Sequence, residues 1–148
     1  MILEKTVFLG ETLHSKDEIF SFIAKQAYKL EIVHDEQVAV SDLKKREAEV
    51  STGLQDGFAI PHCRTENVKK TAILFIRLDN EIKWETFDGK DVKNVFCILV
   101  PAGSENNNAI HLQLISKIAV NLLEDEFKQK IATAKSTKEI VELINFED

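Results

Sequence analysis

The pattern of apolar and polar residues predicts two helices in the first third of the chain. Apolar residues at helical spacing follow two N-cap signals, the Ser15-x-x-Glu18 capping box and Asp35. The second predicted helix ends close to Arg46. The short apolar segment 2–9 is expected to form a strand or an extended lead-in.

The middle of the chain has the pattern of β-strands. Residues 71–78 place apolar residues on both faces of a strand, and residues 95–100 are a continuous apolar run, so we expect two buried strands, the second closed by Pro101. Between them, Ile82 and Trp84 alternate with charged neighbours, which is typical of a half-exposed edge strand.

The last third of the chain is predicted to be helical. A long helix is expected from about Ala109 to Leu123, and a shorter helix follows around 127–134. A second capping box, Ser136 with Glu139, opens a helix near the C-terminus. Helices and strands are mixed along the chain without repeats or linkers, which indicates one α/β domain over residues 1–148, with helices covering a sheet.

The segment 46–64, REAEVSTGLQDGFAIPHCR, concentrates residues that suit a functional site. Its two glycines favour a sharp turn or a close backbone approach to a ligand. The apolar run 58–60 predicts a buried strand, which Pro61 would end because proline has no donor for the sheet. His62 is therefore expected at a strand tip rather than inside the sheet.

A second histidine, His111, follows another strand that ends in proline. If the two strands are neighbours, His62 and His111 would meet at one edge of the sheet, where sites in α/β proteins usually lie. Together with Arg46 and the Ser51-Thr52 pair they would form an anion site. Because neutral imidazole is a nucleophile near pH 7, such a site suits a phosphoryl group carried on histidine.

Simpler interpretations exist for several of these residues. Arg46 at a helix end is also explained by the helix dipole, and Ser51 and Thr52 by loop or cap roles. His14 and His34 lie beside predicted caps and receive no function.

Two other chemistries use the same region of the chain. A zinc site would need ligand spacings that Cys63 and Cys97 do not provide, since neither has a second cysteine two to four residues away. A Cys-His hydrolase would pair Cys63 with His111, but no family signature for that chemistry surrounds either residue.

Composition narrows the function classes. The net charge of −6, from 25 acidic and 19 basic side chains, argues against non-specific nucleic-acid binding. The N-terminal residues are interrupted by charges too early for a signal peptide, and no apolar run is long enough to span a membrane. We therefore expect a cytoplasmic protein with both cysteines free.

A family pattern is present in the segment 46–64 and around His111. It consists of Arg46-Glu47, Thr52-Gly53, Gly57, Ala59-Ile60-Pro61-His62 and, further on, Val100-Pro101 followed by His111-Leu112. This pattern resembles the active-site signature of the enzyme IIA components of the phosphoenolpyruvate-dependent sugar phosphotransferase system (PTS), fructose/mannitol class. The resemblance spans essentially the whole chain and implies a single α/β domain with a mixed β-sheet of about five strands flanked by helices.

The resemblance implies a phosphocarrier that needs neither cofactor nor metal. His62 would accept a phosphoryl group from phospho-HPr and pass it to a cysteine of enzyme IIB, which serves the membrane permease IIC. His111 would stabilise the transferred group, Arg46 would neutralise its oxygens or orient the loop, and Thr52 would support the site by hydrogen bonding. Cys63, beside His62, departs from the expected small or polar residue and would make the site sensitive to oxidation if exposed.

The resemblance leaves the biological role open. A regulatory enzyme IIA of the nitrogen-related kind keeps the same histidine, so His62 does not separate regulation from sugar uptake. The intact set of His62, His111 and Arg46 argues against a third alternative, a binding module without phosphoryl transfer.

Overall fold

A five-stranded mixed sheet forms the centre of the protein, in a computed structural model that describes residues 4–103, 113 and 115–144. The strands lie in the order β1-β4-β5-β2, and β3 also pairs with β5. Their bounds are Val7–Glu11 (β1), Phe58–Ala59 (β2), His62–Thr65 (β3), Ala72–Ile82 (β4) and Val92–Pro101 (β5). A short 3-10 helix, Glu4–Thr6, precedes β1.

The pairing directions make the sheet mixed. Strand β1 is parallel to β4, and β4 is antiparallel to β5. Strands β2 and β3 follow one another along the other side of β5, both parallel to it. The expectation of a mixed sheet of about five strands is confirmed, and β5 ends at Pro101 as predicted.

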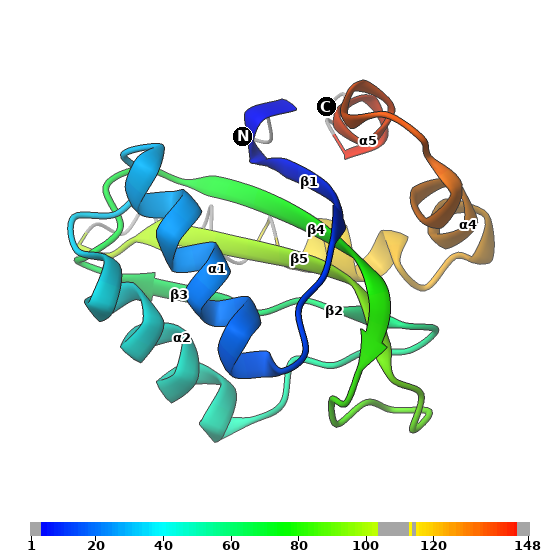
Figure 1. Cartoon of the computed structure of the whole chain (residues 1–148), viewed down its shortest axis with the longest axis horizontal. Helices are drawn as coiled ribbons and strands as arrows, with labels where there is room; N and C mark the ends of the chain where they lie inside the picture. The colour runs from blue at the N-terminus through cyan, green and yellow to red at the C-terminus, as the bar shows by residue number, and fades with distance from the viewer. Residues whose placement is uncertain (1–3, 104–112, 114, 145–148) are drawn as a thin grey trace.

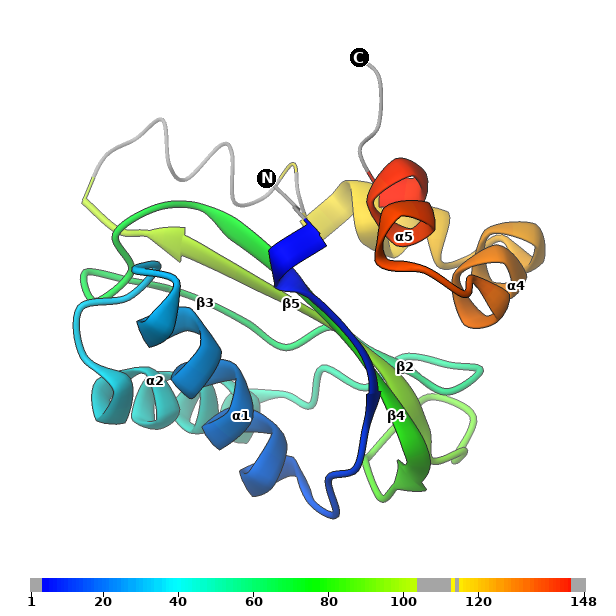
Figure 2. The same cartoon turned by 45° about the horizontal axis from the view of Figure 1, so that its top comes forward.

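Helices cover both faces of this sheet (Figures 1 and 2). One face carries α1 and α2, and the other carries α4, α5 and the helical residues 115–121. The bounds of the labelled helices are Lys16–Lys29 (α1), Glu36–Glu49 (α2), Asp125–Thr133 (α4) and Thr137–Ile144 (α5). No helix in the described part of the chain is long and apolar enough to cross a membrane.

Side-chain caps start three of these helices where the sequence predicts them. The Ser15 hydroxyl accepts the Glu18 N–H at 3.1 Å at the start of α1. The Asp35 carboxylate caps α2 in the same way, and the Ser136 hydroxyl accepts the Glu139 N–H at 3.1 Å before α5. Each cap satisfies an amide that the helix itself leaves without a partner.

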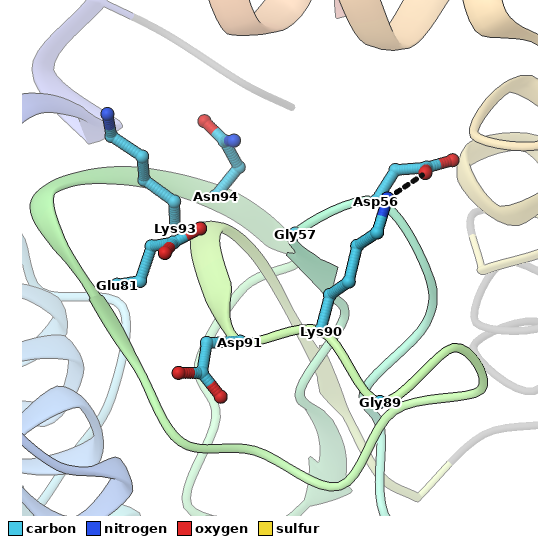
Figure 3. Close-up of a pocket in the computed structure, with 8 residues that line it drawn as sticks. All are labelled: Asp56, Gly57, Glu81, Gly89, Lys90, Asp91, Lys93 and Asn94. Atoms are coloured by element: carbon cyan, nitrogen blue, oxygen red, sulfur yellow. Dashed lines mark ion pairs between the residues drawn. The ribbon is translucent and has the colours of Figure 1, made fainter.

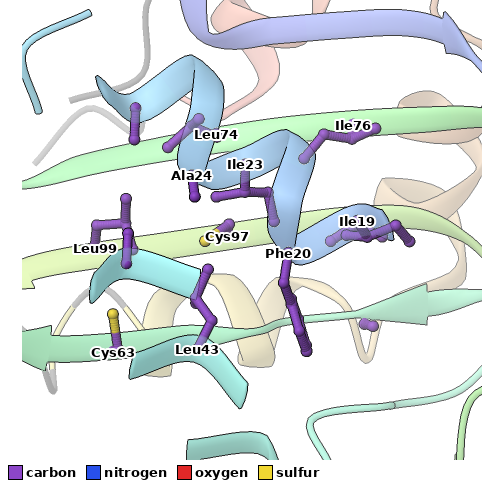
Figure 4. Close-up of a cluster of buried hydrophobic side chains, with 14 of the residues drawn as sticks. Ile19, Phe20, Ile23, Ala24, Leu43, Cys63, Leu74, Ile76, Cys97 and Leu99 are labelled. Atoms are coloured by element: carbon purple, nitrogen blue, oxygen red, sulfur yellow. The ribbon is translucent and has the colours of Figure 1, made fainter. Parts of the chain in front are cut away.

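A separate hydrophobic core fills the space on each side of the sheet. Figure 4 shows the core under α1 and α2, where Leu43 and Phe20 face alternate residues of the strands, with both cysteines among them. The second core lies under α4, α5 and residues 115–121, and Phe75 and Phe96 pack there with ring centroids 4.7 Å apart. Because a core packs against each face, the sheet is a firm support for side chains at its edge.

Two sequence-based expectations for this region are wrong. Ile82 belongs to β4, an internal strand, and Trp84 lies in the following loop with only 6% of its surface exposed. The predicted edge strand therefore does not exist. The alternation of apolar and charged residues around Ile82 and Trp84 arises because Trp84 is buried in a loop, not because the segment is an edge strand. His62 is not a free strand tip either, since it opens β3 and pairs with Ile98 of β5.

Candidate functional site

A tight hairpin delivers the chain to His62. Asp56 and Gly57, with φ angles of 56° and 84°, form its turn, and the Phe58 N–H donates to the Gln55 carbonyl at 3.2 Å. Both turn residues adopt the left-handed region, as a type I′ hairpin turn requires. The glycines of this segment predict a sharp turn, and the Asp56-Gly57 pair is a recognised signal for this particular hairpin turn.

The first arm of the hairpin, residues 51–54, lies tightly against the loop after β4. A Cβ atom on Gly53 would be 2.1 Å from the Glu85 carbonyl oxygen, so only glycine fits there. The Ser51 hydroxyl donates to the same oxygen at 2.7 Å. Ser51 thus has a structural role, and the arm has little freedom to shift.

His62 is half-buried at the start of β3. Its Nδ1 lies 2.9 Å from the carbonyl oxygen of Ile60, which assigns the proton to Nδ1 and the lone pair to Nε2. The register partner of His62, Ile98, belongs to the core under α4 and α5, so His62 faces that side of the sheet. The next residue, Cys63, faces the opposite core.

Burial lowers the pKa of His62 below its usual value of 6.5. The hydrogen bond to the Ile60 carbonyl raises this pKa, the positive charge of Arg46 lowers it, and the negative charge of Glu47 raises it. The lowering effects prevail. At neutral pH the ring is therefore uncharged, which is the state a nitrogen nucleophile needs.

Arg46 lies in the last turn of α2 and donates to the Val50 carbonyl at 3.1 Å. This contact caps the helix end, as the dipole interpretation anticipated. Arg46 is also close enough to His62 to influence its pKa, so its positive charge acts at the site as well.

The structure gives Thr52 a buried position and a carboxylate as its hydrogen-bond partner. Its hydroxyl and its backbone N–H both donate to Glu47, at 2.5 and 2.9 Å. Thr52 supports the hairpin arm through these bonds. His111, the remaining predicted site residue, lies outside the described residues.

Glu47 is the functional candidate that the sequence reasoning missed. Its carboxylate is buried, with 6% of the side chain exposed, and the indole N–H of Trp84 donates to it at 3.0 Å. A signal exists in the sequence: Ala39, Leu43 and Glu47 are spaced four apart on one helix face, and all three are buried. A carboxylate on an apolar stripe must have partners inside the protein.

The cysteine chemistry considered above does not fit this geometry. The thiol of Cys63 is buried, and burial raises its pKa to about 12. Burial also raises the pKa of Cys97 well above its usual range. A protonated, buried thiol is a poor nucleophile and resists oxidation, so the concern about oxidation of Cys63 is removed. Among the residues described, no group of three or more His, Cys, Asp and Glu side chains is arranged to hold a metal ion.

A polar cavity of about 520 Å³ lies beside the hairpin turn and the β4–β5 connection (Figure 3). Its lining mixes both signs of charge, and Asp56 and Lys90 point toward each other at 3.6 Å. The residues that line it are Asp56, Gly57, Glu81, Gly89, Lys90, Asp91, Lys93 and Asn94. This cavity is distinct from the group formed by Arg46, Thr52 and His62.

Comparison with known proteins identifies the family. Residues 1–147 match the family model described as "Phosphoenolpyruvate-dependent sugar phosphotransferase system, EIIA 2". The chain belongs to this family of enzyme IIA domains. The resemblance inferred from the residues around His62 is thereby confirmed.

Relatives of this enzyme IIA include both transport and regulatory proteins. The chain is 30% identical over 148 residues to the PTS system fructose-specific EIIABC component of Mycoplasma pneumoniae. The match covers 97% of this chain but only 21% of that protein, so the chain spans about a fifth of the relative's length.

Two solved structures share the fold closely. The nitrogen regulatory protein IIA-Ntr from Neisseria meningitidis has a TM-score of 0.89 at 28% identity, covering 97% of this chain and 96% of that one. Enzyme IIAMTL in its complex with phosphorylated enzyme IIBMTL, from Escherichia coli, has a TM-score of 0.77 at 23% identity. That match covers 97% and 98% of the two chains.

Proposed function

We propose that this enzyme IIA accepts a phosphoryl group from phospho-HPr on His62 and passes it to a cysteine of enzyme IIB. The observation that carries the proposal is the state of the His62 ring. Its Nδ1 is bonded to the Ile60 carbonyl, and its pKa is lowered chiefly by burial. The ring is thus neutral, oriented, and has its lone pair on Nε2.

In the proposed reaction, Nε2 of His62 attacks phosphorus in line with the leaving nitrogen of the donor histidine. The new N–P bond forms as the donor's N–P bond breaks, and the proton stays on Nδ1, which donates it in the hydrogen bond to the Ile60 carbonyl. The Nδ1 bond thereby stabilises the positive charge that the ring gains. Such transfer depends mainly on positioning and charge neutralisation.

Arg46 and His111 are proposed to neutralise the phosphoryl oxygens. Arg46 already lends positive charge to the site, as its effect on the pKa of His62 indicates. His62 faces the side of the sheet on which residues 115–121 pack, and His111 lies four positions before Ile115 in the sequence. With these cations no metal or other cofactor is needed, and the phosphoryl group is carried covalently as phosphohistidine.

The proposed partners are HPr on the donor side, and enzyme IIB with its IIC permease on the acceptor side. The solved complex of enzyme IIAMTL with phosphorylated enzyme IIBMTL supports an enzyme IIB as acceptor. In this proposal the protein acts in the cytoplasm and serves sugar uptake.

A regulatory role is the second candidate. The structural similarity to IIA-Ntr of Neisseria meningitidis favours it, because that match extends over nearly the whole of both chains. In this role the phosphorylation state of His62 would control a protein partner. The chemistry at His62 would be the same, so both roles rest on the same first step.

The test is phosphorylation of the purified chain with phosphoenolpyruvate, enzyme I and HPr. We expect an acid-labile adduct on the wild type and none on His62→Ala. The His111→Ala variant should still form the adduct but transfer it more slowly to a cognate IIB. Equal labelling of the wild type and His62→Ala would exclude His62 as the acceptor.

Labelled protein would then be offered to an enzyme IIB. Fast transfer to an IIB cysteine supports sugar uptake. A stable adduct that no IIB accepts, together with capture of a partner by only one phosphorylation state, supports regulation.

A further inference from the structure

The carboxylate of Glu47 lies between α2, the hairpin arm and the loop after β4. One oxygen, Oε2, accepts from the Thr52 N–H at 2.9 Å, the Trp84 indole at 3.0 Å and the Lys16 ammonium at 3.3 Å. The other, Oε1, accepts from the Thr52 hydroxyl at 2.5 Å. Burying a charge is costly unless donors compensate for the lost water. The four donors to Glu47 provide this compensation and together define the position of its carboxylate.

The bonds of Glu47 continue to His62 through the backbone. Thr52 donates its N–H to Glu47 and accepts the Ile60 N–H on its carbonyl at 2.9 Å. Ile60 in turn accepts the Nδ1–H of His62 on its carbonyl, also at 2.9 Å. Three successive hydrogen bonds therefore join the Glu47 carboxylate to the histidine ring.

The other side of Glu47 is equally well fixed. Lys16 bridges the carboxylates of Glu47 and Glu85, at 3.3 and 3.0 Å, and lies over the ring of Trp84. Gly53 leaves no space between the hairpin arm and the Glu85 backbone. A displacement of Glu47 would therefore move the hairpin arm, and with it Ile60, whose N–H is bonded to the Thr52 carbonyl of that arm.

We propose that Glu47 is a positioning residue that fixes the Nδ1–H tautomer of His62, through Thr52 and Ile60, and so directs Nε2 at the phosphoryl donor. This inference rests on the proposed function of His62. Its structural part, the link between Glu47 and the tautomer, does not depend on phosphoryl transfer and is measured separately.

Two substitutions separate the effect of the side-chain length of Glu47 from the effect of its charge. Glu47→Gln keeps an oxygen for the Thr52 and Trp84 N–H groups, and the Thr52 hydroxyl turns to accept from the new amide. Glu47→Asp keeps the charge, but it is one methylene too short to reach both Thr52 donors.

Asp42→Asn is the matched control. Asp42 lies on the same helix and accepts from the Thr65 hydroxyl at 2.8 Å, so it also joins α2 to β3. It has no part in the bonds that lead to His62.

The first readout is the ring-nitrogen NMR shifts of His62, which report the tautomer without any PTS partner. We expect the Nδ1–H form in the wild type, Glu47→Gln and Asp42→Asn, and a mixture of tautomers in Glu47→Asp. The second readout is the rate of phosphorylation by phospho-HPr. It should fall about 10- to 100-fold in Glu47→Asp and stay within about threefold of wild type in the other two variants.

Urea unfolding of all three variants separates positioning from simple loss of stability. Glu47→Gln removes the buried one of the two charge partners of Lys16, so we expect it to lose stability while it keeps its transfer rate. Rates that follow stability across the three variants would overturn the proposal, as would an unchanged tautomer in Glu47→Asp. If Glu47→Asp does not fold, a mixed tautomer in folded Glu47→Gln overturns the proposal and a pure Nδ1–H form supports it. An unlabelled wild type would instead refute the proposed function alone.

Discussion

At His62, burial and a neighbouring cation act on the ring in the same direction. Both lower its pKa, while the Ile60 carbonyl and Glu47 raise it by a smaller amount. A residue in this setting stays neutral at pH 7. In the proposed reaction it would become positively charged only when it receives a negative phosphoryl group. The hydrogen bond to the Ile60 carbonyl selects Nε2 as the ring nitrogen that would receive this group.

This setting predicts a specific pH dependence. The folded protein binds a proton at His62 less readily than the unfolded chain, whose histidine titrates near its usual value of 6.5. The contribution of His62 to stability is therefore complete above that pH and is lost as the pH falls toward the folded-state pKa. NMR titration should give a His62 midpoint below 6.5.

The control for the pH effect is His62→Gln, which has no group that titrates at this position. Urea unfolding of wild type and variant from about pH 7.5 to 5 should show a steeper loss in the wild type. Parallel curves, or an NMR midpoint above the usual value, would contradict the pKa direction.

At the scale of elements, the sequence predicted features that depend on neighbouring residues, but not those that depend on contacts between distant segments. Ser15, Asp35 and Ser136 start helices because a cap depends only on the next three residues. Trp84 was misassigned because it is buried by contacts with residues distant in sequence, among them Phe20 and Glu47. The pairing of His62 with β5 was also missed. Pro61 interrupts the strand, but the chain continues along β5 after it, and His62 begins β3.

One long-range contact joins β4 to α4. The Arg77 guanidinium donates to the Ile131 and Ala134 carbonyls, at 2.5 and 2.6 Å, at the C-terminal end of the helix. Hydrogen bonds from a charged donor are stronger than neutral ones, so Arg77→Met should lower the free energy of unfolding by about 2 kcal/mol.

Urea unfolding measures the loss, and amide exchange should locate it in the last turn of α4. Lys130→Met is the control, because Lys130 is on the same helix and its exposed side chain forms a surface ion pair with Glu126 at 3.0 Å. Its expected effect is within about 0.5 kcal/mol. Similar losses for the two variants would mean that the Arg77 contacts add nothing beyond a surface charge.

At the scale of the whole molecule, the site lies where the two layers of helices meet the edge of the sheet. Arg46 and Glu47 come from the layer of α1 and α2, whereas His62 faces the layer of α4 and α5. His62 and Arg46 could be named as candidates from the sequence because their residue types are those of an anion site. The buried Glu47 network was not, because it needs contacts from three separate segments.

Two large apolar side chains are exposed next to this edge. Phe87 is 80% exposed and Val50 is 67% exposed, and the Phe87 N–H donates to the Leu54 carbonyl of the hairpin arm at 2.8 Å. Exposed apolar groups of this size beside a transfer site are suited to contact a protein partner. Since Phe87 contributes little to the core, Phe87→Ser should change stability by no more than about 0.5 kcal/mol.

The same substitution should slow phosphorylation by sub-saturating phospho-HPr by about fivefold or more, because it removes apolar contact area from the docked complex. Tyr28→Ser is the matched control. Tyr28 is 52% exposed near the end of α1, at the end of the α1–α2 pair opposite to Arg46. Rates measured across a range of HPr concentrations should show a raised KM for Phe87→Ser and wild-type behaviour for Tyr28→Ser. An equal effect of both variants on the rate would mean that the donor docks elsewhere on the surface. A lowered kcat with unchanged KM for Phe87→Ser would mean that Phe87 acts on the site itself rather than on docking.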